Sequence, residues 1–354
     1  MLNLAEAFRD MDHPVDLLLL DEAHGRPVPD GVNVVRLGHR TRQALGPVVR
    51  YLRMVRPGLI ISARDYINLL MLAGRKAAGL SRDAKLIWTY HTHTSSELRC
   101  APRLADQVVG ALADRLIQQV DARVGVSMGV AQDLERRLGL APGKVGVVSN
   151  PIWTKSRLDL RNAPCPHPWL SARQPGERSA TAPVVVGVGR LTTQKDFANL
   201  LDSFALLQRQ NPSSRLIILG EGEDRVELVA RAERLGLANR VSMPGHVPDP
   251  LPYLSRADLF VLSSRWEGFS IALVEALGAG CPVVSTDCPS GPSEILEGGR
   301  IASLVPPGDP AALALAMERT LAVPGSLELR LAASLKYDAQ RAAREYLRAV
   351  ALHE

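Results

Sequence analysis

The 354-residue sequence contains few cysteines and no arrangement that would pair them. No Cys-x-x-Cys motif and no zinc-ligand spacing occurs among its four cysteines, Cys100, Cys165, Cys281 and Cys288. Free thiols are typical of proteins in a reducing compartment. The cysteine pattern therefore excludes a small secreted protein that is held together by disulfides.

Long apolar segments are also absent. A membrane-spanning helix needs about 18 or more consecutive apolar residues, and the longest candidate here, residues 270–280, is interrupted by Glu275. The first 15 residues carry charges and lack the apolar core of a signal peptide. These absences exclude an integral membrane protein and predict a cytoplasmic one, with a peripheral position on the inner face of the cytoplasmic membrane left open.

Aromatic residues are scarce, at 4% of the chain. Proteins that bind single-stranded nucleic acid stack bases on aromatic side chains within a basic groove, and no basic stretch here is interleaved with aromatics. No zinc-finger, zipper or RNA-recognition pattern occurs either. Nucleic acid is therefore not an expected partner.

Basic charge is concentrated in the first half. Residues 1–150 contain 20 Lys and Arg against 15 Asp and Glu, whereas residues 151–354 contain 22 of each. The stretch from Arg36 to Arg64 holds no acidic residue and seven arginines: Arg36, Arg40, Arg42, Arg50, Arg53, Arg56 and Arg64. Such a cluster can attract an anionic membrane surface or a phosphorylated substrate. The alternative interpretation is an ordinary solvated helix face.

Short apolar runs alternate with helical stretches throughout the second half. Strands are predicted at residues 184–188, 215–219, 258–262, 282–285 and 301–305, and helices at 195–210, 224–235, 270–278 and 310–322. This alternation is typical of an α/β protein with a parallel, doubly wound sheet. The predicted strands are continuously apolar, as expected for a sheet that is buried on both faces.

The first half repeats the alternation, with strands predicted at residues 15–20, 32–37, 59–62, 85–90, 122–126 and 145–149. A helix at residues 2–10 precedes them, so the strand that should open a doubly wound domain is expected to be missing. The last stretch, residues 327–354, is predicted to be helical. We predict an N-terminal domain over residues 1–158, a linker or surface excursion over 159–182, a C-terminal domain over 183–335 and a C-terminal helix over 336–354. A ligand is expected at the carboxyl ends of the strands, in a cleft between the two domains.

A glycine-containing turn with a lone lysine follows the first strand of the second half. Gly189 allows the backbone to approach a ligand, and a helix begins close by, which favours an anion. Lys195 is the only lysine within residues 156–335, and a point charge five residues after Arg190 suits a phosphate. The alternative is an incidental cation at a helix start. Thr192 stands where a dinucleotide fingerprint has its third glycine, which argues against an NAD-dependent dehydrogenase.

The most specific motif is the segment EGFSIALVE, which begins with Glu267 and ends with Glu275. Glu275 is the only charged residue within 268–286, and a carboxylate in apolar surroundings is costly unless it is hydrogen-bonded. Vicinal hydroxyls of a ligand can supply those bonds; alternatively, the carboxylate is bonded to backbone or to an arginine. A helix that opens at this point would direct the N–H groups near Phe269 and Ser270 toward an anion. A diphosphate site beside hydroxyl acceptors fits a nucleotide sugar.

The Glu-x7-Glu spacing, preceded by GRLTTQKD at residues 189–196 and GEGEDR at 220–225, resembles the retaining glycosyltransferases of family 4. The resemblance covers nearly the whole chain and is strongest over residues 184–297. It implies the GT-B fold, in which two Rossmann-like domains face a cleft. The segment DCPSGPSE at residues 287–294 is similar to bacterial transferases that build polysaccharides and lipid-linked oligosaccharides.

The resemblance also implies a role for each site residue. Arg190 and Lys195, beside Gly189, would hold the donor diphosphate. Glu267 would contact sugar hydroxyls near the reacting carbon, and Glu275 would accept hydrogen bonds from the ribose. The remaining donor contacts would come from amides near Phe269, Ser270 and Ile271, and from a nucleobase-binding turn formed by Gly245, His246 and Val247.

A candidate catalytic histidine lies in the first half, directly after the strand predicted at residues 85–90. The family carries a histidine near the transferring sugar, and His91 matches it better than His93. The implied role is hydrogen bonding and electrostatic stabilisation of an oxocarbenium-like transition state. The alternative is a structural histidine at a strand end.

The sequence thus predicts a retaining glycosyltransferase of the hexosyltransferase class that uses no metal or other cofactor. It would move a sugar from a nucleoside-diphosphate sugar, expected to be UDP-linked, to a glycan or lipid-linked acceptor in cell-surface polysaccharide or glycolipid synthesis. Its one Asp-x-Asp motif, at residues 10–12, lies at a helix end rather than a strand end. Two other classes remain open: a nucleotide-sugar epimerase or phosphorylase of the same fold, and a non-catalytic protein that binds the donor or forms complexes.

Overall fold

The computed structural model describes residues 1–20, 28–37, 43–98 and 104–351, which form two compact units. The first unit consists of residues 1–154 together with 338–354, and the second of residues 155–337. The predicted C-terminal domain began only at residue 183, whereas the second unit begins at residue 155. The last helix was predicted to stand apart, and in the structure it is part of the first unit.

The second unit is built on one parallel sheet of six strands in the order β12-β11-β10-β7-β8-β9. The first strand in sequence, β7, lies between β8 and β10, so the sheet is doubly wound. Its strands are β7 (Val184–Val188), β8 (Arg215–Leu219), β9 (Val241–Gly245), β10 (Leu259–Leu262), β11 (Val283–Thr286) and β12 (Ser303–Val305). All five predicted strands are confirmed, and β9 is a sixth that the sequence analysis missed.

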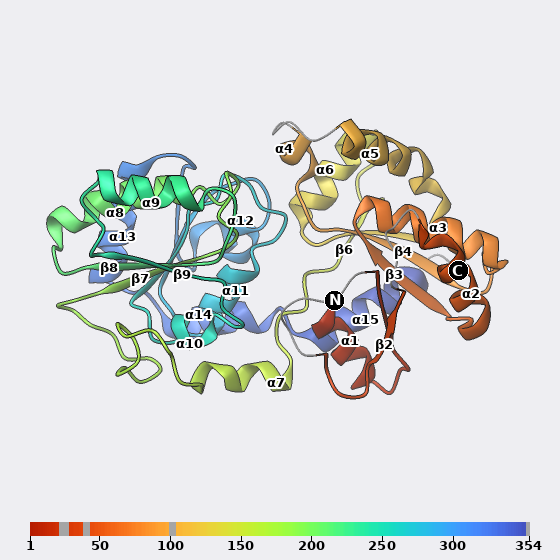
Figure 1. Cartoon of the computed structure of the whole chain (residues 1–354), viewed down its shortest axis with the longest axis horizontal. Helices are drawn as coiled ribbons and strands as arrows, with labels where there is room; N and C mark the ends of the chain where they lie inside the picture. Colours follow the sequence, from red (N-terminus) through yellow and green to blue (C-terminus); the bar gives the residue numbers. More distant parts are fainter. Residues whose placement is uncertain (21–27, 38–42, 99–103, 352–354) are drawn as a thin grey trace. The chain divides into compact units, whose positions relative to one another are not determined.

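Helices cover both faces of this sheet, with α8, α9 and α13 on one face and α10, α11 and α14 on the other (Figure 1). The core beneath the first group includes Phe204, Leu216 and Met317, which are all buried. The helices of the unit are α7 (Lys155–Leu158), α8 (Phe197–Gln210), α9 (Arg225–Arg234), α10 (Leu251–Leu254), α11 (Ile271–Gly278), α12 (Pro292–Ile295), α13 (Pro310–Ala322) and α14 (Leu327–Leu335), with 3-10 turns at Asp159–Asn162 and Glu297–Gly299.

Residues 159–182, predicted as a linker or surface excursion, pack onto the second unit. Cys165 and Leu170 are buried. The His167 ring lies 3.0 Å from the Ser242 hydroxyl, and the Arg173 guanidinium lies 2.6 Å from the Asp258 carboxylate. These contacts make the segment part of the second unit rather than a separate linker.

The first unit contains two parallel sheets, β1-β2 and β3-β4-β5-β6. The strands are β1 (Asp16–Leu19), β2 (Asn33–Arg36), β3 (Leu59–Ala63), β4 (Lys85–Tyr90), β5 (Ala122–Gly125) and β6 (Gly146–Val147). The helices are α1 (Leu2–Arg9), α2 (Leu45–Val55), α3 (Asp65–Ala78), α4 (Thr94–Leu98), α5 (Leu104–Leu116), α6 (Met128–Leu138) and α15 (Ala339–Ala351), with a 3-10 turn at Ile117–Gln119. All six predicted strands are present, although β6 is shorter than predicted.

The separation of β1-β2 from β3-β4-β5-β6 agrees with the expected missing strand. In the second unit, β7 occupies the place between the second and fourth strands. The corresponding place in the first unit lies between β1 and β3, and the described residues form no strand there. The described strands of the two sheets thus follow the order of a Rossmann-like domain without a strand at this place.

Helices α1 and α15 pack together and against the larger sheet of the first unit. Their shared core includes Leu4, Phe8, Ala343 and Tyr346, all buried. The stretch predicted to be helical, residues 327–354, contains two helices, because α14 ends at Leu335 and α15 begins at Ala339. Within the described residues, no helix is both long enough and apolar enough to span a membrane.

Candidate functional site

Backbone hydrogen bonds join the loops that follow the strands of the second unit. The Gly220 N–H donates to the Gly245 carbonyl at 2.9 Å, which links the loop after β8 to the end of β9. The Glu267 N–H donates to the Pro289 carbonyl at 3.0 Å, which links the loops after β10 and β11. The carboxyl edge of a parallel sheet is where ligands bind in such folds, and the predicted donor residues lie in these loops and at the start of α11.

Lys195 and Glu267 are brought into direct contact. The Lys195 ammonium Nζ lies 2.6 Å from Glu267 Oε1, and the Ser264 hydroxyl donates to the same oxygen at 2.6 Å. A Cβ atom at Gly189 would lie 3.1 Å from the aliphatic part of the Lys195 side chain. Glycine at this position therefore gives the lysine room to reach the glutamate, and the pair places a cation and a carboxylate side by side.

The neighbours of this ion pair are held by further hydroxyls that the sequence analysis missed. The Ser263 hydroxyl donates to the Lys195 carbonyl at 2.8 Å, and the Thr286 hydroxyl donates to the Ser264 carbonyl at 2.7 Å. Asp196 accepts hydrogen bonds from the Asn199 N–H at the start of α8 and from Arg265. The ion pair is therefore fixed by its surroundings. In the sequence, the two successive serines directly after the apolar strand β10, Ser263 and Ser264, could have indicated these hydroxyl contacts.

Several groups near these loops have spare hydrogen-bonding capacity. The side-chain hydroxyls of Thr192, Ser270 and Ser290 are buried and have no hydrogen-bond partner among the described residues. Arg190 is exposed. Buried unpaired hydroxyls are uncommon in folded proteins, and a ligand or bound solvent is a usual explanation.

Helix α11 begins at Ile271, one residue after the start of the helix predicted at residues 270–278. Its N-cap residue Ser270 makes no side-chain cap, and its first turn contains no acidic residue. The Phe269 ring packs edge-on against the Tyr337 ring, with 5.1 Å between the ring centroids. An uncapped helix start with a fixed preceding residue is suited to an anion.

Glu275 lies on the buried side of α11 and pairs with an arginine. Its Oε1 atom accepts from the Arg157 guanidinium, which also lies 3.2 Å from Asp249 Oδ2. Burial disfavours a charged guanidinium, but the two carboxylates more than offset this and raise the pKa of Arg157. The arginine contact is one of the two alternatives left open for Glu275, and Arg157 itself was not predicted.

The predicted nucleobase turn starts at the last residue of β9. Gly245 has φ +91°, a backbone conformation that favours glycine, and it lies beside the Glu221 side chain. His246 is exposed and Val247 is half-buried. The turn leaves the edge of the sheet beside the loop after β8.

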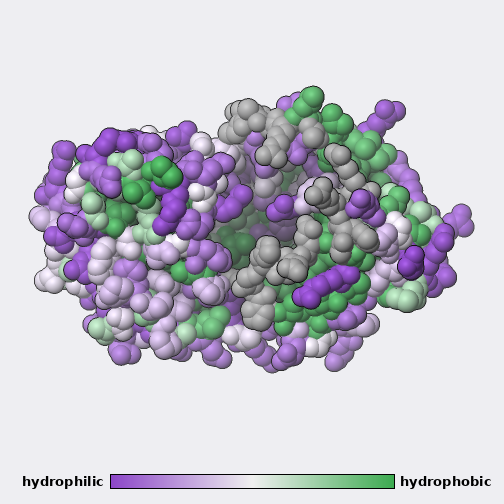
Figure 2. All heavy atoms as spheres, viewed as in Figure 1, coloured by the Kyte–Doolittle hydropathy of each residue, from purple (hydrophilic) through white to green (hydrophobic). Residues whose placement is uncertain are grey.

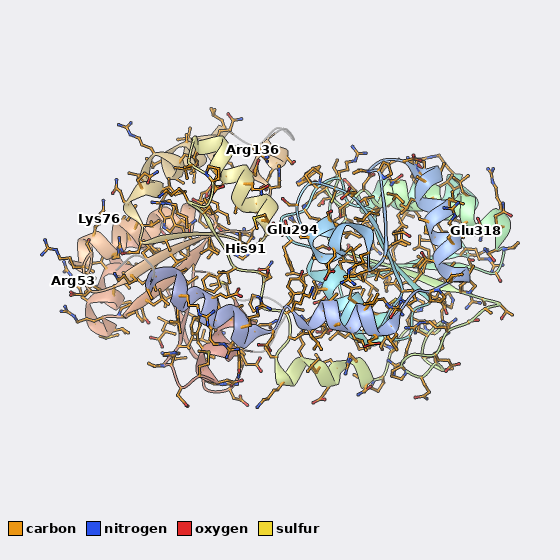
Figure 3. The ribbon with its side chains drawn as sticks, turned by 180° about the vertical axis from the view of Figure 1, so that it is seen from behind. Arg53, Lys76, His91, Arg136, Glu294 and Glu318 are labelled. Carbon is orange, nitrogen blue, oxygen red and sulfur yellow. The ribbon has the colours of Figure 1, made fainter. Side chains whose placement is uncertain are left out.

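His91 lies in the first unit at the end of β4 (Figure 3). The Thr89 hydroxyl donates to the Ser62 carbonyl at 2.9 Å and lies 3.0 Å from His91 Nε2. Because the hydroxyl proton is engaged with the carbonyl, the imidazole donates from Nε2 to the hydroxyl oxygen. Burial lowers the pKa of His91 to about 4, helped by the charges of the N-terminus and Arg64 and opposed by a hydrogen bond with Asn150. His91 is therefore neutral at physiological pH.

His93 is held by local contacts. Its Nδ1 lies 3.0 Å from the Ser96 hydroxyl, and its Nε2 lies 3.6 Å from Asp133 Oδ1. Asp133 is buried and also accepts from the Ser95 N–H at 3.0 Å. These contacts fasten the start of α4 to α6, which is a structural role.

Comparison with known proteins gives two family matches that divide the chain between them. The model "Glycosyl transferases group 1" matches residues 171–341, and the model "Glycosyltransferase Family 4" matches residues 1–155. The lipopolysaccharide core biosynthesis glycosyltransferase LpsE of Rhizobium meliloti is 37% identical over 153 residues, which cover 43% of this chain and 43% of that protein.

A second relative acts on a lipid-linked substrate by name. It is the N-acetylgalactosamine-N,N'-diacetylbacillosaminyl-diphospho-undecaprenol 4-alpha-N-acetylgalactosaminyltransferase of Campylobacter jejuni. It is 30% identical over 184 residues, which cover 52% of this chain and 46% of that protein. The chain thus matches less than half of the length of each of these two relatives.

A solved structure shares the fold over almost the whole chain. The Anabaena protein Alr3699/HepE, in complex with UDP-glucose, superposes with a TM-score of 0.74 at 21% identity and covers 98% of this chain and 94% of that one. Both units are parallel α/β sheets with helices on their faces, and each is matched by a glycosyltransferase family model. The chain belongs to the glycosyltransferases of the GT-B fold, in the group related to family 4.

Proposed function

We propose that this protein is a retaining glycosyltransferase that moves a sugar from a UDP-sugar to a glycan or lipid-linked acceptor in cell-surface polysaccharide or glycolipid synthesis. The observation that carries the proposal is the contact between Lys195 and Glu267 at the carboxyl edge of the sheet. It places a phosphate-binding cation next to a carboxylate that can accept from sugar hydroxyls. The UDP-glucose complex of the Anabaena protein and the lipid-linked substrate of the Campylobacter relative support the choice of donor and acceptor.

In the proposed complex, the donor changes the partner of Lys195. The diphosphate accepts from the Lys195 ammonium and from the exposed Arg190, so that Glu267 is left to the sugar hydroxyls. The start of α11, with the amides of Phe269, Ser270 and Ile271, adds N–H donors to the phosphates or the sugar. Glu275 accepts from the ribose hydroxyls, and the turn from Gly245 to Val247, with His246 between them, meets the base.

His91 acts in the proposed mechanism as a neutral hydrogen-bonding group. An imidazole that stays uncharged at physiological pH can orient and stabilise polarised groups of the transferring sugar without adding a positive charge beside an oxocarbenium-like centre. The acceptor oxygen attacks the anomeric carbon from the face that the diphosphate leaves. The acceptor proton passes to the departing phosphate oxygen, so the bond to the acceptor forms as the bond to the diphosphate breaks and configuration is retained.

The proposal requires no metal, because Arg190, Lys195 and the start of α11 together neutralise the leaving diphosphate. Transfer is therefore expected to continue in excess EDTA. Loss of activity in EDTA that Mg²⁺ or Mn²⁺ restores would contradict this part of the proposal.

We also propose that the first unit contacts an anionic membrane surface, which would place the protein on the inner face of the cytoplasmic membrane. Helix α2 exposes Arg50, Arg53 and Met54, and the exposed Arg53 guanidinium donates to the Ala77 carbonyl at 2.8 Å. Helix α5 exposes Leu104, Val108 and Leu112 at four-residue intervals, and Figure 2 shows hydrophobic atoms over it. Of the predicted cluster, Arg40 and Arg42 lie outside the described residues, and Arg56 pairs with Asp83.

Vesicle sedimentation tests this contact. Binding to vesicles that contain anionic lipid is expected to weaken with salt and with the double variant Arg50→Gln, Arg53→Gln. Equal binding to neutral vesicles, or binding that ignores both changes, would contradict it.

Nucleotide binding tests the donor site. Isothermal titration should show binding of UDP by the wild type and at least a tenfold loss in Lys195→Met. The matched control is Lys336→Met, because Lys336 also pairs with a glutamate of the second unit but does so at the surface. Unchanged UDP affinity in Lys195→Met would remove the lysine from the site. Product formed from the donor alone would favour an epimerase over a transferase.

A further inference from the structure

Arg157 joins two carboxylates in a buried cluster of the second unit. Its guanidinium contacts Glu275 Oε1 and lies 3.2 Å from Asp249 Oδ2. The exposed fractions of the Arg157 and Glu275 side chains are only 5% and 4%, and that of Asp249 is 15%. Water therefore screens the charges of this cluster poorly, and each charge is stabilised mainly by the opposite charges beside it.

The arginine reaches Glu275 from a segment that is itself fixed. Asp249 Oδ1 accepts from the Leu251 N–H at 2.9 Å, which holds this carboxylate at the start of α10. Arg161, four residues after Arg157, donates to the Gly278 carbonyl at 3.1 Å, at the end of α11. The segment that carries Arg157 is thus tied to α11 at two places, Glu275 and Gly278.

The other side of α11 is also fastened. The Ser334 hydroxyl of α14 donates to the Val274 carbonyl at 3.0 Å, one residue before Glu275. Phe269, just before α11, packs against Tyr337. The backbone of Glu275 is therefore held by α14 and the residue pair Phe269–Tyr337, and its carboxylate by Arg157.

Only one oxygen of the Glu275 carboxylate is used by the arginine. Arg157 bonds Oε1, and no group among the described residues donates a hydrogen bond to Oε2. A carboxylate held by one oxygen can present the other to a ligand in a fixed direction. The guanidinium thereby leaves a free acceptor on Glu275.

We infer that Arg157 is a positioning residue for nucleotide binding, which holds Glu275 by its Oε1 atom and directs the Oε2 atom toward the ribose hydroxyls. The inference rests on the proposed function, because it takes Glu275 as the ribose acceptor. Without the guanidinium, Glu275 and Asp249 would be two buried carboxylates that face each other with no cation between them. One of the two would then hold a proton at neutral pH.

The test is UDP affinity as a function of pH in the variant Arg157→Met, which removes the charge and keeps an unbranched side chain. At pH 7 we expect UDP to bind at least tenfold more weakly than in the wild type. Raising the pH to 9 should recover much of the loss, because the second carboxylate ionises. In the part of the chain that the structure describes, the ion pairs of this cluster join Arg157 of α7 to Glu275 and to Asp249 in the loop before α10, so the variant removes the cation that these two carboxylates share.

Two further variants separate positioning from stability. Arg157→Lys restores a cation and should recover affinity at pH 7. Arg173→Met removes a guanidinium from Asp258 in the same unit, a pair with side-chain exposures of 13% and 3%. Asp258 directly precedes β10, so it lies at the amino ends of the strands, whereas the donor loops follow their carboxyl ends. This control should lower the melting temperature and leave UDP affinity unchanged.

The outcomes distinguish this inference from the proposed function. If the wild type binds UDP, Glu275→Ala loses binding and Arg157→Met binds as the wild type does, Arg157 has no positioning role and the donor site stands. An affinity loss in Arg157→Met that is the same at every pH, or that Arg173→Met reproduces, would also overturn the inference. If the wild type itself binds no nucleoside diphosphate, the proposed function fails, and the inference with it.

Discussion

The neutral histidine at the end of β4 leads to a prediction about stability and pH. Burial lowers the pKa of His91 from 6.5 to about 4. Between these values the unfolded chain binds a proton at His91 and the folded chain does not, so acidification favours unfolding. One pKa unit corresponds to about 1.4 kcal/mol, so most of the full difference of about 3 kcal/mol is expressed between pH 7.5 and pH 4.5. Partial exposure of the ring reduces the expected effect to about 2 kcal/mol.

The variant His91→Gln cannot take up this proton. Its stability relative to the wild type should therefore increase by about 2 kcal/mol as the pH falls from 7.5 to 4.5. Native-state hydrogen exchange of the β4 amides measures the opening free energy of the first unit alone, and Ile87 and Trp88 in this strand are fully buried. A difference between variant and wild type that stays constant over this pH range would refute the assignment of a neutral His91.

A carboxyl group in the same unit, that of Asp65, gives an internal control with the opposite sign. Burial raises the pKa of Asp65 from 3.8 to about 6, with Asp114 and Glu97 adding to this and Arg137 opposing it. The folded chain holds this proton more tightly, so its contribution to stability is lost as the pH rises through 6. Asp65→Asn should therefore gain about 2 kcal/mol relative to the wild type as the pH rises from 4 to 7. The same hydrogen-exchange experiment measures how stability changes with pH in both variants.

Three further predictions concern stability. Asp309 accepts hydrogen bonds from the Ala311 and Ala312 N–H groups at the start of α13. Asp309→Ala should therefore lower the free energy of unfolding by about 1 kcal/mol and the calorimetric melting temperature of the second unit by roughly 2–4 °C, whereas Asp309→Asn should stay near the wild type. Phe204 is fully buried, and Phe204→Ala should cost about 3–5 kcal/mol in urea unfolding; a smaller loss would mean that the core collapses around the cavity. Arg64 has φ +73°, so Arg64→Gly should add about 1 kcal/mol to the opening free energy of β3, and a decrease would show that the arginine side chain contributes more than its backbone strain costs.

Sequence patterns were sufficient for the strands that are buried on both faces. The run VVVGV at Val184–Val188 is continuously apolar, and its predicted bounds are those of β7. The strand β9 was missed because its sequence VSMPG ends in proline and glycine and lies at the sheet edge, where it is only partly buried. Edge strands tolerate such residues, so composition alone argues against them.

Contacts between residues far apart in the chain could not be predicted from the sequence. The apolar run around Glu275 showed that its carboxylate needs a partner, but the partner, Arg157, lies 118 positions earlier in the chain. The break between α14 and α15 has a similar origin. Residues 336–338 contain no proline or glycine, and α15 begins at Ala339, which donates its N–H to the Trp153 carbonyl at 2.9 Å. Both features are set by tertiary pairing.

The thiol of Cys288 lies close to the candidate donor site. Burial and the charge of Glu267 raise the pKa of this thiol to about 12, and the side chain is buried. Thiol reagents attack the thiolate, so Cys288 can react at neutral pH only when its loop opens to solvent. In a chain that retains Cys288 as its single cysteine, the rate of thiol labelling would measure how often this loop opens. A nucleotide that closes the loop would slow the labelling, so the same reagent would compare loop opening with and without nucleotide.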